Sequence, residues 1–353
     1  MQNPIPLVSV VVPLYNKRHY ILRCLDSISR QTMSDFEVIV VDDGSQDGGG
    51  ILAQHVQDPR MRVVRQTNRG VGAARNRGIL ESAGNLIAFL DADDSWEPQF
   101  LEAVVSLASR YPQAGIYATG YRKLFAHRKA RDTTIADPGK DGARVLEDYF
   151  LAAQEGHLIT SSSVAIRRAV LNEVGPFLEN EPMGEDLDLW ARICLRYPVA
   201  FDARILAVYH MESQGRAVDH WKPTAFTPLP VVRYLRRQLL TAGVSRAMHE
   251  SVRTYIDCVL IEHAYSLVWR QEQEQLREFL KTETFMTPKF RKRARLLDLG
   301  IRLLPFRLIA ALKWKPEHLV QWWRHTFLGR SRFGSGRRFL MIRDGGEPHG
   351  GGQ

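Results

Sequence analysis

Three aspartates stand within four residues at the end of an apolar run, in the segment FLDADDSW at residues 89–96. Like charges at this spacing repel one another and raise the pKa of each carboxyl group unless a cation lies between them. One aspartate could cap a helix expected at 97–110, with a proline in its first turn. A cap uses a single carboxylate, so the set Asp91, Asp93 and Asp94 needs a further explanation.

Polar residues also follow two other expected strands, the β-branched run LVSVVVPLY and the run FEVIVV. These residues are Pro13, Tyr15, Asn16, Asp42, Asp43, Gly44 and Ser45. In an open parallel sheet, ligands bind in the crevice beyond the carboxyl ends of the strands. We therefore expect the three strand ends to converge on one pocket.

The residue types at this pocket favour a particular ligand. Carboxylates separated by one residue, with no His or Cys nearby in sequence, suit Mg²⁺ or Mn²⁺, which keeps waters and shares its remaining positions with phosphate oxygens. A bound cation would also lower the carboxyl pKa values and remove the repulsion. The pattern predicts a divalent metal and a diphosphate beside Asp91 and Asp93.

The elements that position these residues alternate between strand and helix through residues 1–112. Strands are expected at LVSVVVPLY, FEVIVV, MRVVRQ and NLIAFL, and a helix at about 72–82. The helix after the first strand should bury Ile21, Leu22, Leu25 and Ile28. Such alternation predicts an α/β fold, a Rossmann-like and mostly parallel sheet sandwiched between helices.

The next segment, 113–220, continues the same domain. Residues 126–143 are polar and punctuated by Gly and Pro, which predicts a mobile loop. SSSVAI resumes strand character, and EDLDLWARICLRY predicts a helix. Its buried face should hold Leu187, Trp190, Ile193 and Cys194.

The string GVGAAR from Gly70 follows a strand and opens a helix, as a dinucleotide-binding fingerprint would. Its third glycine position is Arg75, so a nicotinamide site is not expected. Arg69, Arg75 and Arg77 instead offer donors to an anion near a helix N-terminus. The alternative is that they are solvated surface arginines.

Composition sets wider bounds. The chain of 353 residues is long enough for two domains or for one large domain with appendages, and its 44% hydrophobic content supports a proper core. We expect no secretory signal at its start and no membrane span. The three cysteines, Cys24, Cys194 and Cys258, are widely spaced and lie in helical patterns, which predicts reduced core thiols in a cytoplasmic protein.

The net charge of +9 is concentrated near the C-terminus. Residues 284–343 hold fifteen Lys and Arg against two acidic residues, within a region 221–343 that is expected to be helical. Basic, aromatic and aliphatic residues around Pro305 predict two short interfacial helices on anionic lipid. The alternative is a solvated basic face of a helical bundle, while nucleic acid is disfavoured by the acidic remainder. Residues 344–353 should be disordered.

Five blocks in order carry a family resemblance. They are VSVVVPLYNKRHYILRCLDSISRQT, FEVIVVDDGSQDG, NRGVGAARNRGI, FLDADDSWEP and GEDLDLW. Over residues 6–215 this sequence resembles the family 2 inverting glycosyltransferases, which have a nucleotide-diphospho-sugar transferase (GT-A type) fold. The resemblance implies that 1–112 binds the nucleotide-sugar and that 113–220 binds the acceptor.

The resemblance also implies roles for single residues. Asp43 and the segment Pro13 to Asn16, with Tyr15, would hold the base and ribose, with Arg75 beside them. Asp91, Ala92 and Asp93 match the aspartate-any-aspartate motif, in which Asp93 would be the more direct metal ligand.

The catalytic base implied by the resemblance is the acidic pair that opens a later helix. We expect Asp186 to take the acceptor proton and Glu185 to help place the acceptor; the alternative for Asp186 is a first-turn acid stabilised by the helix dipole. His210 would contact the metal or the pyrophosphate, or be structural. Ser161 and Ser162 lie near the expected acceptor groove, where strand-edge hydrogen bonding is the favoured interpretation.

These inferences give one prediction of function. The chain is expected to transfer a sugar, with inversion, from a UDP-sugar to a hydroxyl of a glycan or lipid-linked acceptor, using Mn²⁺ or Mg²⁺. The expected setting is bacterial cell-surface polysaccharide biosynthesis at the inner face of the cytoplasmic membrane. The alternatives are a phosphohydrolase that uses Asp91 and Asp93, and a non-catalytic module that binds membrane or nucleic acid.

Overall fold

A computed structural model describes the greater part of the chain. It describes residues 5–126, 128–135, 137, 139, 142–214, 229–241, 243–270, 272–303 and 343–344. The chain divides into two compact units, one of Met1–Trp221 with Phe339–Gln353 and one of Lys222–Arg338. Each unit is described by itself below.

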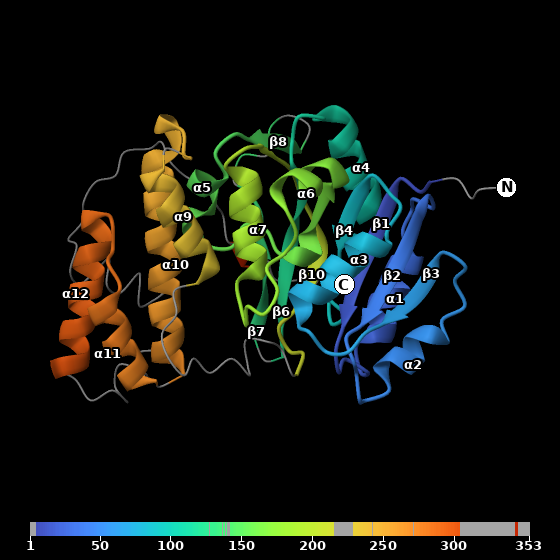
Figure 1. The fold of residues 1–353 in the computed structure, drawn as a ribbon, viewed down its shortest axis with the longest axis horizontal. Coiled ribbons are helices and arrows are strands. Elements are labelled where there is room, and N and C mark those ends of the chain that lie inside the picture. Colours follow the sequence, from blue (N-terminus) through green and yellow to red (C-terminus); the bar gives the residue numbers. More distant parts are fainter. Residues whose placement is uncertain are drawn as a thin grey trace, which may run out of the picture. The chain divides into compact units, whose positions relative to one another are not determined.

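The first unit is built on one sheet, in which β1 lies between β2 and β4 (Figure 1). Four strands are mutually parallel: β1 (Val8–Leu14), β2 (Phe36–Asp42), β3 (Met61–Arg65) and β4 (Leu86–Phe89). β9 (Val164–Arg167) runs antiparallel between β4 and β6 (Ile116–Phe125). β10 (Val199–His210) is parallel to β6. The predicted α/β sheet is confirmed; its central strands are parallel, while β9 is inserted antiparallel and further antiparallel strands pair with β6 and β10.

Helices cover both faces of this sheet, as the continuous apolar strands require. The helices are α1 (Ile21–Ser29), α2 (Gly49–Gln54), α3 (Val71–Glu81), α4 (Phe100–Arg110), α5 (Tyr149–Ala152), α6 (Arg168–Val174) and α7 (Glu185–Cys194). On β2, Val38 and Val40 belong to the core that includes α1 and α4. Ile39 and Val41 point to the other face and pack with Ala74 of α3. Alternate residues of one strand therefore serve two cores.

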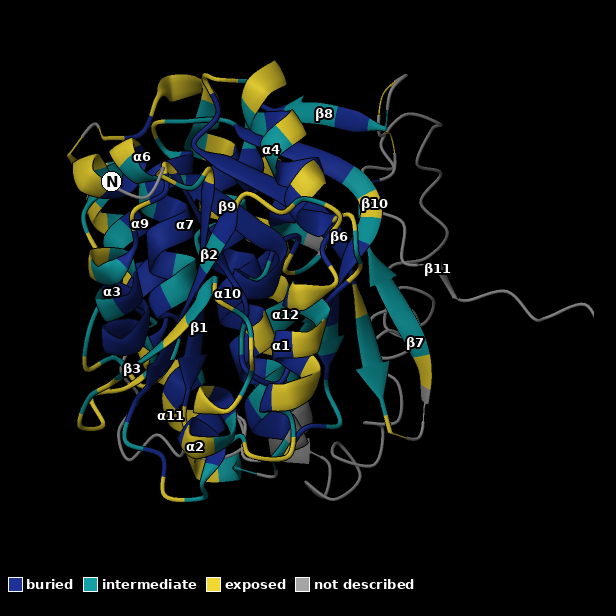
Figure 2. Ribbon diagram, turned by 90° about the vertical axis from the view of Figure 1, so that its right-hand side faces the viewer, coloured by how far each residue is buried: buried dark blue, intermediate teal, exposed yellow. Residues whose placement is uncertain are grey.

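Residues 126–143 were expected to form a loop, and that prediction was wrong for part of the segment. β7 (Arg128–Thr133) pairs antiparallel with β6, and β8 (Ala143–Leu146) pairs with β10. An Arg122–Asp132 ion pair of 2.6 Å joins the two strands of the hairpin. Figure 2 shows β7 as less buried than the central strands. A half-exposed strand does not need apolar residues, which is why its polar sequence suggested a loop.

The aspartates of FLDADDSW do not cap a helix. α4 begins at Phe100 instead of residue 97, its N-cap is Gln99, and it has no side-chain cap. Ser95–Trp96 forms the short strand β5 against β10. The Trp96 ring stacks on Phe100 with centroids 4.1 Å apart, so the segment packs as a strand and the helix starts later.

Two predicted helix faces were wrong in one position each. In α1, Leu22 is 49% exposed and Cys24 is buried in its place. In α7, Leu189 is buried and Leu187 is only half-buried.

All three cysteines are buried and none is in a disulfide, as predicted. The predicted strand SSSVAI begins only at Val164, because the three serines form a 3-10 turn.

The second unit is helical in its described part. It contains α9 (Pro230–Leu240), α10 (His249–Trp269), α11 (Gln273–Thr282) and α12 (Pro288–Leu303). The buried carboxylate of Asp257 in α10 accepts hydrogen bonds from the backbone N–H groups of Met286 and Thr287, both at 2.7 Å. This contact fixes the chain just before α12.

The basic region 284–343 therefore starts inside the helical unit, where Phe285 and Phe290 are buried. Pro305 and the helices predicted around it lie outside the described residues. Asp344, which was expected in a disordered tail, pairs with β7 in the two-residue strand β11 (Arg343–Asp344). The rest of that tail, 345–353, also lies outside them. Among the described residues, no helix is both long and apolar enough to cross a membrane.

Candidate active site

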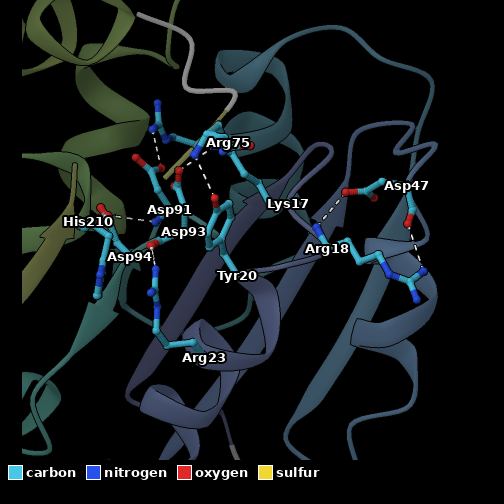
Figure 3. A network of polar contacts seen from close by, with 12 residues as sticks. Lys17, Arg18, Tyr20, Arg23, Asp47, Arg75, Asp91, Asp93, Asp94 and His210 are labelled. Carbon is cyan, nitrogen blue, oxygen red and sulfur yellow. Dashed lines mark hydrogen bonds and ion pairs between the residues drawn. The ribbon is translucent and has the colours of Figure 1, made fainter. Parts of the chain in front are cut away.

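The carboxyl ends of β1, β2, β4 and β10 lie at the same edge of the sheet. β1, β2 and β4 are parallel, and β6 runs in the same direction because β9 is antiparallel to both β4 and β6. β10 is in turn parallel to β6. The segment after β1, the aspartates after β4 and the end of β10 meet there (Figure 3). The N-terminus of α7 joins them through contacts of Glu185. The structure thus brings together most of the residues that the sequence analysis selected.

Arg75 connects α3, the β4 end and α7. Arg75 is 3% exposed, and its guanidinium donates to Glu185 Oε1 at 2.6 Å and to Asp91 Oδ1 at 2.8 Å. Burial opposes its charge, but the charges of Asp91 and Glu185 outweigh burial and raise the pKa of Arg75. Burial, followed by the charge of Asp186, raises the pKa of Glu185, while Arg75 opposes that shift. The anions that Arg75 binds in this structure are therefore two protein carboxylates, those of Asp91 and Glu185.

Asp93 is held by two cations, Lys17 from the segment after β1 and Arg23 from α1. Lys17 Nζ lies 2.6 Å from Asp93 Oδ2 and donates to the Gln214 carbonyl at 3.0 Å. The Arg23 guanidinium donates to the Asp93 carbonyl at 2.6 Å. Sequence reasoning did not select Lys17 or Arg23. The signal was the run of cations that directly follows the first strand.

Asp94, the third aspartate, is 1% exposed and fixes the loop. One of its oxygens is 2.6 Å from Ser162 Oγ, and the other accepts the backbone N–H of His210 at 3.1 Å. Ser162 Oγ also accepts the backbone N–H of Asp91 at 3.2 Å. Burial, with the charges of Asp91 and Asp93, raises the pKa of Asp94 well above its usual range. Ser162 thus makes the strand-edge hydrogen bonds that were favoured for it.

His210 is buried at the end of β10, with both ring nitrogens in hydrogen bonds. Nδ1 lies 2.7 Å from Glu212 Oε1, and Nε2 lies 2.9 Å from Ser95 Oγ. Burial lowers the pKa of His210, although the hydrogen bond to Glu212 opposes this shift. A neutral ring that donates through Nδ1 to a carboxylate has the orientation of many metal-binding histidines. Binding a metal would require Nε2 to leave Ser95.

Asp43 is 2% exposed, and its carboxylate is occupied by uncharged donors. Oδ1 accepts from the Gln66 side chain at 2.8 Å and the Arg69 backbone at 2.9 Å, and Oδ2 accepts from the Gly70 backbone at 2.9 Å. Gly70 has φ +87°, which favours glycine, so the first glycine of GVGAAR shapes the turn that Asp43 holds.

The second glycine of that string allows a close approach. A Cβ on Gly72 would lie 2.3 Å from the Leu178 carbonyl oxygen. The remaining arginines considered as anion donors have other partners. Arg69 pairs with Glu179 at 2.6 Å, and Arg77 pairs with Glu81 along α3 at 2.7 Å.

The segment from Pro13 to Asn16 borders the same edge. Pro13 is buried within β1, opposite Val41, and Tyr15 is 46% exposed. Asn16 has φ +51°, and its side-chain oxygen accepts the Gln46 backbone N–H at 2.9 Å. The ends of β1 and β2 are therefore joined by hydrogen bonds that leave the Tyr15 ring exposed.

Glu185 and Asp186 differ in environment although they are neighbours. Glu185 is 7% exposed and is occupied by Arg75. Asp186 is half-buried, and its Oδ1 accepts the backbone N–H of Leu187 at 2.7 Å. Both residues lie at the N-terminus of α7. Of the two, only Asp186 is partly exposed and has a carboxylate that is not paired with Arg75.

The donor set fits a divalent cation bound through few protein ligands. Lys17 binds one carboxylate oxygen of Asp93, and Arg75 binds one carboxylate oxygen of Asp91. The second oxygen of each carboxylate has no partner within the described part of the chain. Mg²⁺ and Mn²⁺ are commonly held by one or two carboxylates plus substrate phosphates and waters. No group of three or more His, Cys, Asp or Glu in the described residues could form an all-protein metal cage.

Comparison with known proteins finds similar sequences. Residues 9–175 match the sequence model of the family described as Glycosyl transferase family 2. EpsJ of Bacillus subtilis, described as an uncharacterized glycosyltransferase, is 37% identical over 155 residues, which cover 43% of this chain and 44% of that protein. Chondroitin synthase of Escherichia coli is 43% identical over 197 residues, covering 49% of this chain and 27% of that protein. The matches thus span less than half of these relatives.

Solved structures share the fold over nearly the whole chain. The TarS fragment 1-349 of S. aureus in complex with UDP-GlcNAc has a TM-score of 0.63 at 18% identity, covering 95% of this chain and 99% of that one. The mannosyltransferase PcManGT of Pyrobaculum calidifontis, with GDP-Man and Mn²⁺, has a TM-score of 0.54 at 17% identity, covering 93% and 89%.

The fold is that of the GT-A nucleotide-sugar transferase structures. Residues 9–175 contain β1 except Val8, all of β2 to β4, and both Asp91 and Asp93. Residues 9–175 are thus similar to glycosyltransferase family 2, over somewhat less than half of the chain. The predicted family resemblance and the predicted fold are confirmed.

Proposed function

We propose that this chain is a metal-dependent inverting glycosyltransferase that moves a sugar from a UDP-sugar to a hydroxyl group of a glycan or lipid-linked acceptor. One observation carries the proposal. Arg75 joins Asp91 to Glu185, the residue before Asp186, and Lys17 pairs with Asp93 in the same loop as Asp91. These contacts lie at the edge where Asp43 also lies, and all of these residues except the acidic pair are within the segment that matches family 2.

The donor would lie along the ends of β1 and β2. In this proposal the exposed Tyr15 ring and the turn held by Asp43 contact the base and ribose. The UDP-GlcNAc complex of TarS supports a uridine donor, while the GDP-Man complex of PcManGT shows that the fold also accepts guanosine. A direct comparison of the two nucleotides is therefore part of the test.

Asp91 and Asp93 would hold the divalent cation through their carboxylate oxygens, one of which on each residue is used by Arg75 or Lys17. When bound, such a cation stabilises negative charge on the departing diphosphate. The Mn²⁺ in the PcManGT complex supports this choice of metal. Asp94 and Ser162 keep the backbone of the motif in place, so the two carboxylates stay aimed at the same edge.

Asp186 would act as the base. An inverting transfer needs a carboxylate that accepts the proton of the acceptor hydroxyl while its oxygen attacks the sugar C1 opposite the leaving group. Glu185 is neutralised by Arg75, whereas Asp186 is half-buried and bound only by a backbone N–H among its described contacts. Glu185 would position the α7 N-terminus through Arg75.

The proposed setting is the assembly of a bacterial cell-surface polysaccharide at the inner face of the cytoplasmic membrane. The likeness to chondroitin synthase supports a polysaccharide product. The exposed basic residues of α12, Lys289, Arg291, Lys292 and Arg295, are the described part of the surface that would contact anionic lipid.

The first experiment is a binding screen. Melting temperature and calorimetric heat should be measured with UDP-GlcNAc, UDP-glucose, GDP-mannose and NADH, each with and without Mn²⁺. Binding of a UDP-sugar that requires Mn²⁺ supports the proposal, and preference for GDP-mannose would correct the donor. Release of inorganic phosphate without sugar transfer would favour the phosphohydrolase.

The second experiment replaces the base. Asp186→Asn keeps the shape of the side chain but not its basicity, so sugar transfer should fall by about 10²–10⁴-fold. Affinity for UDP and Mn²⁺ should stay within about twofold of wild type, because the base acts on the acceptor proton. Near-normal turnover in this variant would reject Asp186 as the base.

Membrane contact is tested by substitution, since removal of residues after 283 would also remove the donors that satisfy buried Asp257. A variant with Gln at the four exposed basic positions of α12 should bind phosphatidylglycerol vesicles more weakly, by up to about 1 kcal/mol per charge. Sedimentation with phosphatidylcholine vesicles is the control. Equal binding of both proteins to anionic vesicles would contradict this role for α12.

A further inference from the structure

Lys17 holds an unusual position for a residue beside a proposed metal ligand. Its ammonium lies 2.6 Å from Asp93 Oδ2 and 3.0 Å from the Gln214 carbonyl oxygen. Both side chains of the pair are 11% exposed, so water screens their interaction only partly. Lys17 therefore neutralises much of the charge of Asp93.

The two cations of the site are held differently. Arg75 is buried between Asp91 and Glu185, with two hydrogen bonds that its rigid fork makes at once. Lys17 carries a point charge on a flexible stem, which can turn without breaking a second side-chain ion pair. Its nitrogen lies 5.8 Å from the centre of the Tyr20 ring, and Tyr20 Oη accepts the backbone N–H of Gln214 at 2.9 Å. Arg75 is thus fixed, and Lys17 can exchange partners.

We infer that Lys17 is an exchangeable counter-ion of Asp93. It occupies Asp93 in the free protein, leaves it when a divalent cation binds, and then pairs with the diphosphate of the donor. This inference rests on the proposed function and names a further residue that positions the metal ligand and contacts the donor.

Charge balance supports the exchange. When a divalent cation binds Asp93, the ammonium is repelled by it and loses its carboxylate partner. The diphosphate brings negative oxygens to the same place, and the ammonium of Lys17 can donate its N–H groups to them. Lys17 therefore weakens metal binding before the nucleotide arrives and strengthens nucleotide binding once the metal is present. The two ligands should bind with positive coupling, and the coupling should be reciprocal.

The test uses binding alone. Lys17→Met keeps the length of the stem and its contact with the Tyr20 ring but removes the charge. Affinity for Mn²⁺ should be measured by electron paramagnetic resonance without and with UDP, and affinity for UDP by calorimetry at saturating Mn²⁺. In the variant, Mn²⁺ alone should bind about tenfold more tightly, and UDP about tenfold more weakly.

Arg18→Met is the matched control. It removes the same charge from the adjacent residue, which is exposed and contacts Asp47, away from the aspartate motif (Figure 3). Its affinities for Mn²⁺ and UDP should stay within about twofold of wild type. Lys17→Gln provides a second substitution if Lys17→Met does not fold, with the same directions expected.

The outcomes separate this inference from the function on which it rests. If the wild-type protein binds neither Mn²⁺ nor UDP, the proposed function fails. If wild type binds both and the Lys17 variants bind Mn²⁺ alone no more tightly, Lys17 is not a competitor of the metal and the inference is overturned. Equal changes in the Arg18 variant would overturn it as well, because a general charge effect would then explain the data.

Discussion

The acidic ends of β2 and β4 look alike in the sequence, but they are stabilised by different partners. Asp43, after β2, is bound by an amide side chain and two backbone N–H groups. Asp91 and Asp93, after β4, are bound by the cations of Arg75 and Lys17. Neutral backbone donors build a rigid turn, whereas cations can be replaced by another cation. The comparison indicates that the β2 end is a fixed wall and the β4 end is an ion-exchange site.

The largest effect should come from Arg75→Met, which tests whether buried charge holds the β4 end together. Glu185 would remain buried without its partner, so the free energy of unfolding should fall by about 3–5 kcal/mol. Urea unfolding followed by circular dichroism measures the loss. Arg77→Met, which breaks an exposed pair on the same helix, should cost less than about 1 kcal/mol. Equal losses would contradict the special role of Arg75.

Asp43→Asn should have the next largest effect, because it tests the fixed wall. In Asn, an NH₂ group replaces one carboxylate oxygen of Asp43, and this donor would face the N–H donors that the oxygen now accepts. We therefore expect the free energy of unfolding to fall by about 1–3 kcal/mol. The loss should be the same with and without Mn²⁺, since the partners of Asp43 are uncharged. If Mn²⁺ abolished this loss of unfolding free energy, the β2 end would depend on the metal as the β4 end does, and the proposed difference between them would be wrong.

Asp93→Asn tests the ion-exchange site and should change stability by only about 1 kcal/mol, since the amide oxygen can still accept from Lys17. Its effect should instead appear in Mn²⁺-dependent UDP affinity, with a loss of about tenfold or more. Calorimetry at matched Mn²⁺ concentrations measures this change. Unchanged affinity would remove Asp93 from the metal site.

The smallest effect is expected for Asp94→Asn at acidic pH. The folded state raises the pKa of Asp94, so the folded protein keeps a proton that the unfolded chain loses above its ordinary value of 3.8. Unfolding free energy from this group therefore falls as pH rises above that value. Asn mimics the protonated acid, so the variant should lack this fall. Urea unfolding from about pH 4 to 7 measures it, and identical pH profiles would contradict it.

The sequence predicted the sheet well because its central strands are buried on both faces. Continuous β-branched runs such as VSVVV have few other stable structures in a domain of this size. β7 was missed because its half-exposed residues are mostly charged and show no apolar alternation. Leu22 was misplaced because the neighbouring Cys24, a small apolar residue, fills the buried position.

The candidate site was predictable in its acids more than in its cations. Strand-end aspartates can be recognised from local sequence, since the strand direction decides where they lie. The partners of Lys17 and Arg23 depend on how α1 packs beside the β4 end, which no local pattern records. The third aspartate was likewise unexplained until Ser162 and His210, far along the chain, were seen to contact it.

The antiparallel strand β9 has a consequence for biosynthesis. Ile166 pairs with Ile87 of β4 on one side and with Ile116 of β6 on the other. Until this strand leaves the ribosome, β4 has an unpaired edge, and such edges are prone to intermolecular association. Since closing these long-range pairings is slow compared with forming helices, insertion of β9 should be a late step in folding. The yield of correctly folded protein should therefore depend on how quickly translation passes residue 167.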